Sequence, residues 1–163
     1  MRLDANEIIP GLWQGSEPPR GYALAKAGFN VLTLAAEEIQ PKLIEFPGID
    51  AVIHAGINDD PGSGMTAKEW RTATRAAKIV SDHVAAGRRV IVTCQAGVNR
   101  SGMIVALATR NVTGMSGEDC VALVRHRRGV VKLPGGRHLT PLCNPHFADA
   151  VGRLPALRRV ARR

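Results

Sequence analysis

Aromatic residues, cysteines and long apolar runs are all scarce in this chain. Aromatic side chains make up 4% of the 163 residues, so the core must be built mainly from aliphatic side chains and alanine. No stretch approaches the ~20 apolar residues that a membrane-spanning helix needs, and the first residues lack the apolar core of a signal peptide. Three cysteines, an odd number, argue against a disulfide framework. We therefore expect reduced thiols and a cytoplasmic protein.

Acidic residues are scarce in the second half of the chain. Residues 1–70 carry five Lys or Arg and ten Asp or Glu, whereas residues 71–163 carry seventeen and four. A basic half suits nucleic acid, an anionic lipid surface or a phosphorylated protein, and charge alone does not choose among them. The length predicts a single domain over residues 1–163, with its core at about 7–154 and a basic tail at 155–163.

Two common ligand-binding motifs are missing. The chain has no Gly-x4-Gly-Lys-Ser/Thr sequence, which excludes the usual ATP-binding loop. His138, Cys143 and His146 match no common zinc spacing.

Strand and helix patterns alternate along the first two thirds of the chain. This alternation predicts βαβ units and a central, mostly parallel sheet flanked by helices, an α/β fold. A capping box begins a long helix at residue 66, and Ser116 begins a later one. The strands expected before residue 60 cover residues 7–15, 31–34 and 49–57, and short helices are expected at 22–27 and 39–46.

The most informative stretch runs from Val90 to Gly102. An apolar, β-branched segment at 89–92 predicts a buried strand, and the apolar segment 103–108 predicts a buried helix. The loop between them then lies at the carboxyl end of a strand and at a helix N-terminus. Backbone N–H groups converge at such a place and bind anions.

The side chains of this loop suit covalent chemistry on an oxyanion. Cys94 lies beside the N–H groups and the positive end of the helix dipole, which stabilise a thiolate. Arg100 can hold two oxygens of a tetrahedral oxyanion with its planar guanidinium group, and Ser101 can donate its hydroxyl to the sulfur. The predicted substrate-binding residues are Gln95, Ala96, Gly97, Val98, Asn99 and Arg100.

Cys94-x5-Arg100-Ser101 resembles the signature loop of cysteine-dependent protein phosphatases, and Ala96-Gly97-x-Asn99-Arg100-Ser101-Gly102 resembles the dual-specificity group. The similarity runs from about Glu7 to Leu154. It implies a protein tyrosine phosphatase-like fold with dual-specificity topology, a phosphorylated protein substrate and a cysteinyl-phosphate intermediate. It also implies hydrolysis without a metal or other cofactor.

A phosphatase of this kind needs a carboxylic acid to protonate the leaving group. The resemblance places it at the end of a strand, in a hydrophobic-x-Asp pattern that Ile57-Asn58-Asp59 fits, 35 residues before Cys94. Asp59 is the first candidate and Asp60 the second. The alternative is that both aspartates only form a turn before Pro61.

One position departs from the family pattern. Thr93 stands where related phosphatases carry the histidine that ties the loop backbone. A threonine hydroxyl offers one hydrogen bond in its place and no positive charge, so we expect a slower enzyme. Thr93 and the choice between two acids leave a phosphate-binding module without turnover as one alternative. The basic half of the chain suggests another, a phosphatase of RNA 5′ ends or phosphoinositides. The sequence predicts no oligomeric state.

Overall fold

The computed structural model describes residues 2–158. Its centre is a five-stranded sheet in the order β1-β2-β5-β3-β4. β1 and β2 pair antiparallel, and the other neighbouring strands pair parallel, which confirms the predicted mostly parallel sheet. Residues 159–163 of the predicted basic tail lie outside the described residues. The strands are β1 (Ala5–Ile9), β2 (Leu12–Gly15), β3 (Val31–Ala36), β4 (Ala51–Ile57) and β5 (Val90–Thr93).

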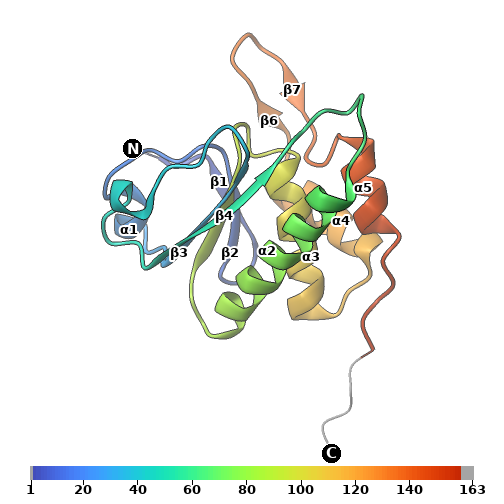
Figure 1. Cartoon of the computed structure of the whole chain (residues 1–163), viewed down its shortest axis with the longest axis horizontal. Coiled ribbons are helices and arrows are strands. Elements are labelled where there is room, and N and C mark those ends of the chain that lie inside the picture. Colours follow the sequence, from blue (N-terminus) through green and yellow to red (C-terminus); the bar gives the residue numbers. More distant parts are fainter. Residues whose placement is uncertain (1, 159–163) are drawn as a thin grey trace, which may run out of the picture.

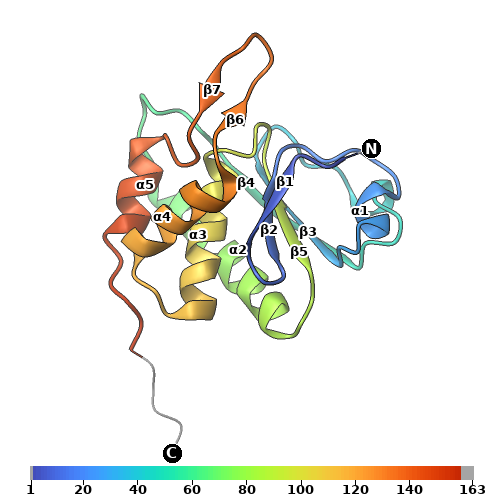
Figure 2. The same cartoon turned by 180° about the vertical axis from the view of Figure 1, so that it is seen from behind.

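Helices lie on both faces of the sheet, but unequally (Figure 1 and, from behind, Figure 2). One face carries the short helix α1 (Ala23–Lys26) and a 3-10 turn at Leu43–Glu45, whereas the other carries four helices. These four are α2 (Ala67–Ala85), α3 (Arg100–Thr113), α4 (Gly117–Arg128) and α5 (Pro145–Gly152).

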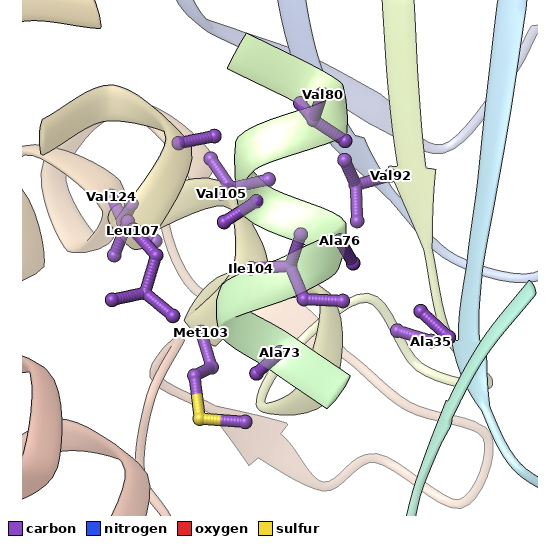
Figure 3. Close-up of a cluster of buried hydrophobic side chains, with 14 of the residues drawn as sticks. Ala35, Ala73, Ala76, Val80, Val92, Met103, Ile104, Val105, Leu107 and Val124 are labelled. Atoms are coloured by element: carbon purple, nitrogen blue, oxygen red, sulfur yellow. The ribbon is translucent and has the colours of Figure 1, made fainter. Parts of the chain in front are cut away.

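The main core is aliphatic and rich in alanine, as the composition predicts. Val92 of β5 and Ala35 at the end of β3 face α2 and α3 (Figure 3). The facing side chains of α2 are small, which lets this helix approach the sheet and α3 closely. Ile91 points to the opposite face and joins the second, smaller core. The residues of α2 and α3 labelled in Figure 3 are Ala73, Ala76, Val80, Met103, Ile104, Val105 and Leu107.

Two predicted helix starts are confirmed. Thr66 accepts a hydrogen bond from the Glu69 backbone N–H at 3.2 Å, and the Glu69 carboxylate accepts one from the Thr66 N–H at 2.7 Å. Ser116 caps α4 by accepting from the Asp119 N–H at 3.1 Å. Each cap satisfies N–H groups that the first helical turn leaves without partners.

Three local predictions were wrong or incomplete. Residues 7–15 form the β1–β2 hairpin rather than one strand, because Gly11 has a φ of 83° and reverses the chain. Residues 39–46 form only the turn at Leu43–Glu45, since Pro41 interrupts the helix. A hairpin of β6 (Val131–Lys132) and β7 (His138–Leu139), which projects from the molecule in Figure 1, was not predicted.

Within residues 2–158, no helix combines the length and the apolar character needed to cross a membrane.

Candidate active site

The predicted loop lies at the carboxyl end of a central strand. β5 ends at Thr93 between β2 and β3, and α3 begins at Arg100. Cys94 is the first residue of the loop and is buried, with 5% of its surface exposed. Parallel strands end at one edge of the sheet, so β3, β4 and β5 bring their following residues to this same place.

The loop keeps its backbone donors free. None of the backbone N–H groups from Gln95 to Gly102 donates a hydrogen bond to any atom of residues 2–158, and the first to do so is that of Met103, to the Asn99 carbonyl at 2.9 Å. Buried backbone N–H groups normally find an acceptor. A row of donors without protein acceptors at a helix N-terminus therefore fits an oxyanion.

Arg100 is buried and already paired on one side. Its Nη1 and Nη2 atoms donate to the two carboxylate oxygens of Glu38 at 2.5 and 2.7 Å, and Nη1 also donates to the Ile57 carbonyl at 3.2 Å. The Nε atom is buried and has no partner among the described residues. Arg100 therefore keeps one buried donor available for a ligand.

The charges of this pair stabilise each other. Burial is the largest single influence and disfavours the charged guanidinium group, but the hydrogen bond to Glu38 and the negative charges of Cys94, Glu38 and Asp59 together outweigh it, so the pKa of Arg100 is raised. Hydrogen bonding to Arg100 in turn lowers the pKa of Glu38 below its ordinary value. Glu38 was not predicted from the sequence, although it lies two residues after the end of the buried strand β3.

Asp59 lies against the loop through two asparagines. The Asn99 side chain donates to its Oδ2 atom at 3.0 Å, and the side chain of Asn144, at the N-cap of α5, donates to Oδ1 at 2.8 Å. The Asn144 backbone N–H also donates to the Asn99 side-chain oxygen at 3.0 Å. The two asparagines therefore connect the carboxylate of Asp59, the loop and α5.

Asp60 has a different role. Its side chain is exposed and accepts a hydrogen bond from the Gly62 N–H at 2.8 Å, which is a local turn. The turn interpretation therefore describes Asp60, whereas Asp59 is the aspartate brought to the loop.

Ser101 hydrogen-bonds the candidate nucleophile, whereas Thr93 hydrogen-bonds a neighbouring strand. The Cys94 thiol donates to the Ser101 hydroxyl at 3.2 Å, so the predicted contact between them is present. Thr93 donates to the Thr33 carbonyl of β3 at 3.2 Å. Thr93 thus makes one hydroxyl hydrogen bond, but it joins two strands and does not tie the loop.

Two buried polar residues, both missed from the sequence, hold the loop instead. The Gln14 amide nitrogen, from β2, donates to the Gly97 carbonyl at 3.0 Å, and the Arg128 Nε atom donates to the same carbonyl at 3.1 Å. The remaining nitrogens of Arg128 donate to Asp4, just before β1, and to Asn6 of β1 at 2.7–2.9 Å. Hydrogen bonding to Arg128 lowers the pKa of Asp4.

The other two cysteines are separate from this loop. Cys120 is fully buried in the main core, as predicted, and burial raises the pKa of its thiol to about 11. Cys143 is exposed.

No family model and no curated protein matches the chain by sequence. Among solved structures, human DUSP28 superposes with a TM-score of 0.66 at 20% identity, over 93% of this chain and 92% of that one. The human tyrosine phosphatase-like serine/threonine/tyrosine-interacting protein gives 0.67 at 21% identity, over 92% and 94%.

The chain has the dual-specificity phosphatase fold. PTPMT1 in complex with PI(5)P also superposes, with a TM-score of 0.63 at 16% identity over 90% of this chain and 96% of that one. The likeness covers nearly the whole of each molecule. It confirms the fold that the sequence resemblance implied, including the mostly parallel sheet with its flanking helices.

The Glu38–Arg100 pair gives a prediction about stability. Replacing Glu38 by Gln should lower the free energy of unfolding at pH 7 by about 1 kcal/mol, because the guanidinium group loses its charged partner, and solvent screens the half-exposed Glu38 carboxylate. The folded-state pKa of Glu38 is lowered, so its contribution is present above the ordinary glutamate pKa and lost as the pH falls through the folded value. Urea unfolding from pH 7 to 3 measures this.

The difference between the native protein and Glu38→Gln should shrink as the solution becomes acidic. The Asp4–Arg128 pair titrates in both proteins and cancels in the difference. A difference that stays constant down to pH 3 would show that the ion pair does not stabilise the fold.

Proposed function

We propose that this protein is a metal-independent phosphatase that hydrolyses phosphomonoesters on proteins, with Cys94 as nucleophile. The observation that carries the proposal is the loop after β5, where a buried cysteine is followed by a row of backbone N–H groups, Gln95 to Gly102, without acceptors among the described residues. Arg100 adds a buried Nε donor. These groups together would hold the oxygens of a phosphate and stabilise the charge of the transition state.

The first step forms a cysteinyl-phosphate. The Cys94 thiolate attacks phosphorus, and the bond to the ester oxygen breaks. Asp59 gives its proton to that oxygen, so the alcohol or phenol leaves neutral. The hydrogen bond from Asn99 supports this role, because it places Asp59 beside the loop that would hold the phosphate.

The second step returns the enzyme to its starting state. Water attacks phosphorus, the Asp59 carboxylate takes its proton, and the sulfur–phosphorus bond breaks. Inorganic phosphate and the Cys94 thiolate are the products. The Ser101 hydroxyl, 3.2 Å from the sulfur, supports the departing thiolate by a hydrogen bond.

Protein substrates suit the loop better than phosphoinositides. Its predicted binding residues include no lysine, and Arg100 is its single cation. A lipid headgroup with several phosphates would need further cations close to the site. Exposed cations do occur on and beside the β6–β7 hairpin, at Arg127, Lys132 and Arg137, and they favour an anionic partner in general.

A phosphate-binding module without turnover is the second candidate. It is favoured by the contact of Thr93, whose hydroxyl donates to the Thr33 carbonyl of β3 and therefore does not support the loop that carries Cys94.

Substitution of the nucleophile distinguishes the two candidates. The native protein should hydrolyse p-nitrophenyl phosphate and phosphopeptides, and hydrolyse PI(5)P vesicles more slowly. Cys94→Ser should lose turnover to background yet keep vanadate binding, since the N–H groups and Arg100 remain. Binding without hydrolysis in the native protein would support the module, and hydrolysis by a clean Cys94→Ser preparation would exclude the cysteine mechanism.

The acid assignment predicts a dependence on the leaving group. Asp59→Asn should slow the hydrolysis of aryl phosphates with poor leaving groups by about 10²–10⁴-fold. It should slow p-nitrophenyl phosphate much less, because that anion leaves without a proton. Asp60→Asn is the matched control and should leave both rates near native. Should the pattern appear in Asp60→Asn alone, the assignment is off by one residue.

A further inference from the structure

Gln14 is a polar side chain in an apolar setting. It lies in β2, opposite Val92 of β5, and has no exposed surface. Burying an amide in a sheet destabilises the fold unless its polar atoms find partners. The Oε1 atom of Gln14 has none among the described residues. A leucine of similar size would avoid this unpaired oxygen, so burial alone does not explain a glutamine here.

The partners of the Gln14 amide nitrogen all belong to the candidate site. Nε2 lies 3.0 Å from the Gly97 carbonyl, 3.3 Å from the Val98 carbonyl and 3.3 Å from the Ser101 hydroxyl. The two carbonyls can only accept, which fixes the NH2 group on this side of the amide. One N–H is therefore shared by the carbonyls, and the other points to Ser101.

This contact decides what the Ser101 hydroxyl can do. Gln14 only donates, so the Ser101 oxygen accepts from it and its single proton stays available for another acceptor. The Cys94 sulfur is 3.2 Å away. In the thiol form the sulfur donates to Ser101, but in the thiolate form only Ser101 can donate. A chain then runs from the Gln14 N–H through the Ser101 hydroxyl to the thiolate, and each bond strengthens the next.

We propose that Gln14 is a positioning residue that directs the Ser101 proton to the Cys94 thiolate and fixes the loop carbonyls. Gln14 thus holds the loop backbone, a role that Thr93 does not fill, because the Thr93 hydroxyl donates to the Thr33 carbonyl. The inference rests on the proposed cysteine chemistry. Gln14 hydrogen-bonds none of Cys94, Arg100 and Asp59, and it acts through Ser101.

The other charged groups around Cys94 are held by contacts that do not involve the Gln14 side chain. Arg100 is paired with Glu38, Asp59 is held by Asn99, and Arg128 is held by Asp4. None of these charged groups hydrogen-bonds Gln14 in the described residues. A change in the titration of Cys94 on altering Gln14 would therefore come from the amide.

The test measures iodoacetate alkylation of Cys94 as a function of pH, in a Cys143→Ser background that removes the exposed thiol. Gln14→Met keeps the side-chain length and loses both N–H donors. It should raise the pH midpoint of alkylation by about one unit, a tenfold loss of thiolate at a given pH below the midpoint. If the methionine variant does not fold, Gln14→Leu, which also lacks hydrogen-bond donors and carries no charge, replaces it.

Two further variants separate this role from simple loss of stability. Thr93→Val removes a buried hydrogen bond beside Cys94 and should lower the melting temperature without moving the midpoint. Ser101→Ala should raise the midpoint at least as far as Gln14→Met, and adding Gln14→Met to it should change little. An unchanged midpoint in Gln14→Met, or a full further shift in the Ser101→Ala background, would overturn the inference.

Failure of the proposed function would look different. In that case the Cys143→Ser protein with native Gln14 would keep its phosphatase activity after alkylation of Cys94, or it would have no phosphatase activity before alkylation. If alkylation blocks activity and Gln14→Met still matches the native midpoint, only the role of Gln14 is wrong.

Discussion

The structure depends on a row of backbone N–H groups, Gln95 to Gly102, that have no acceptor within residues 2–158. An unpaired donor destabilises a fold by about 1–3 kcal/mol where water does not reach it, and most of this row is buried, although Gln95 is exposed. A loop with free donors therefore has to be held from outside. Gln14 and Arg128 bind its carbonyl groups, and Asn144 binds the Asn99 side chain, so the carbonyls face the protein while the N–H groups remain free.

The same edge of the sheet collects the charged groups. β3 ends just before Glu38, β4 just before Asp59, and β5 just before Cys94. These strands run parallel, so residues distant in the chain meet around one loop. Glu38 orients Arg100 from one side, and Asp59 reaches the loop through Asn99. The arrangement separates the positive group, which would bind phosphate, from the carboxylate, which would transfer a proton.

The sequence predicted the parts of the site that are local. The strand, loop and helix around Cys94 are contiguous, so their geometry follows from pattern and spacing, and the family resemblance indicated Asp59 as the candidate acid after a strand. Glu38, Gln14 and Arg128 were missed because their roles come from long-range contacts: Arg128 meets Asp4 across nearly the whole chain. A polar residue within the apolar segment 12–15 was the one available signal for Gln14.

Errors in the fold prediction had the same origin. The segment 39–46 has apolar residues at helical spacing, but Pro41 outweighs that spacing. β6 and β7 have two residues each, which is too short for any alternation to be visible in the sequence. Thr93 was expected to replace a histidine because of its position beside Cys94. Its side chain points instead to the neighbouring strand, as its hydrogen bond to Thr33 shows.

The central claim is that Cys94 carries the phosphoryl group during turnover. Rapid quenching of the protein during hydrolysis of an aryl phosphate, followed by mass spectrometry of its peptides, tests this directly. The account predicts one added phosphoryl group on the peptide that contains Cys94, and more of it in Ser101→Ala, where the thiolate leaves more slowly. Sustained hydrolysis with no phosphoryl group on Cys94, or with the group on another residue, would contradict the account.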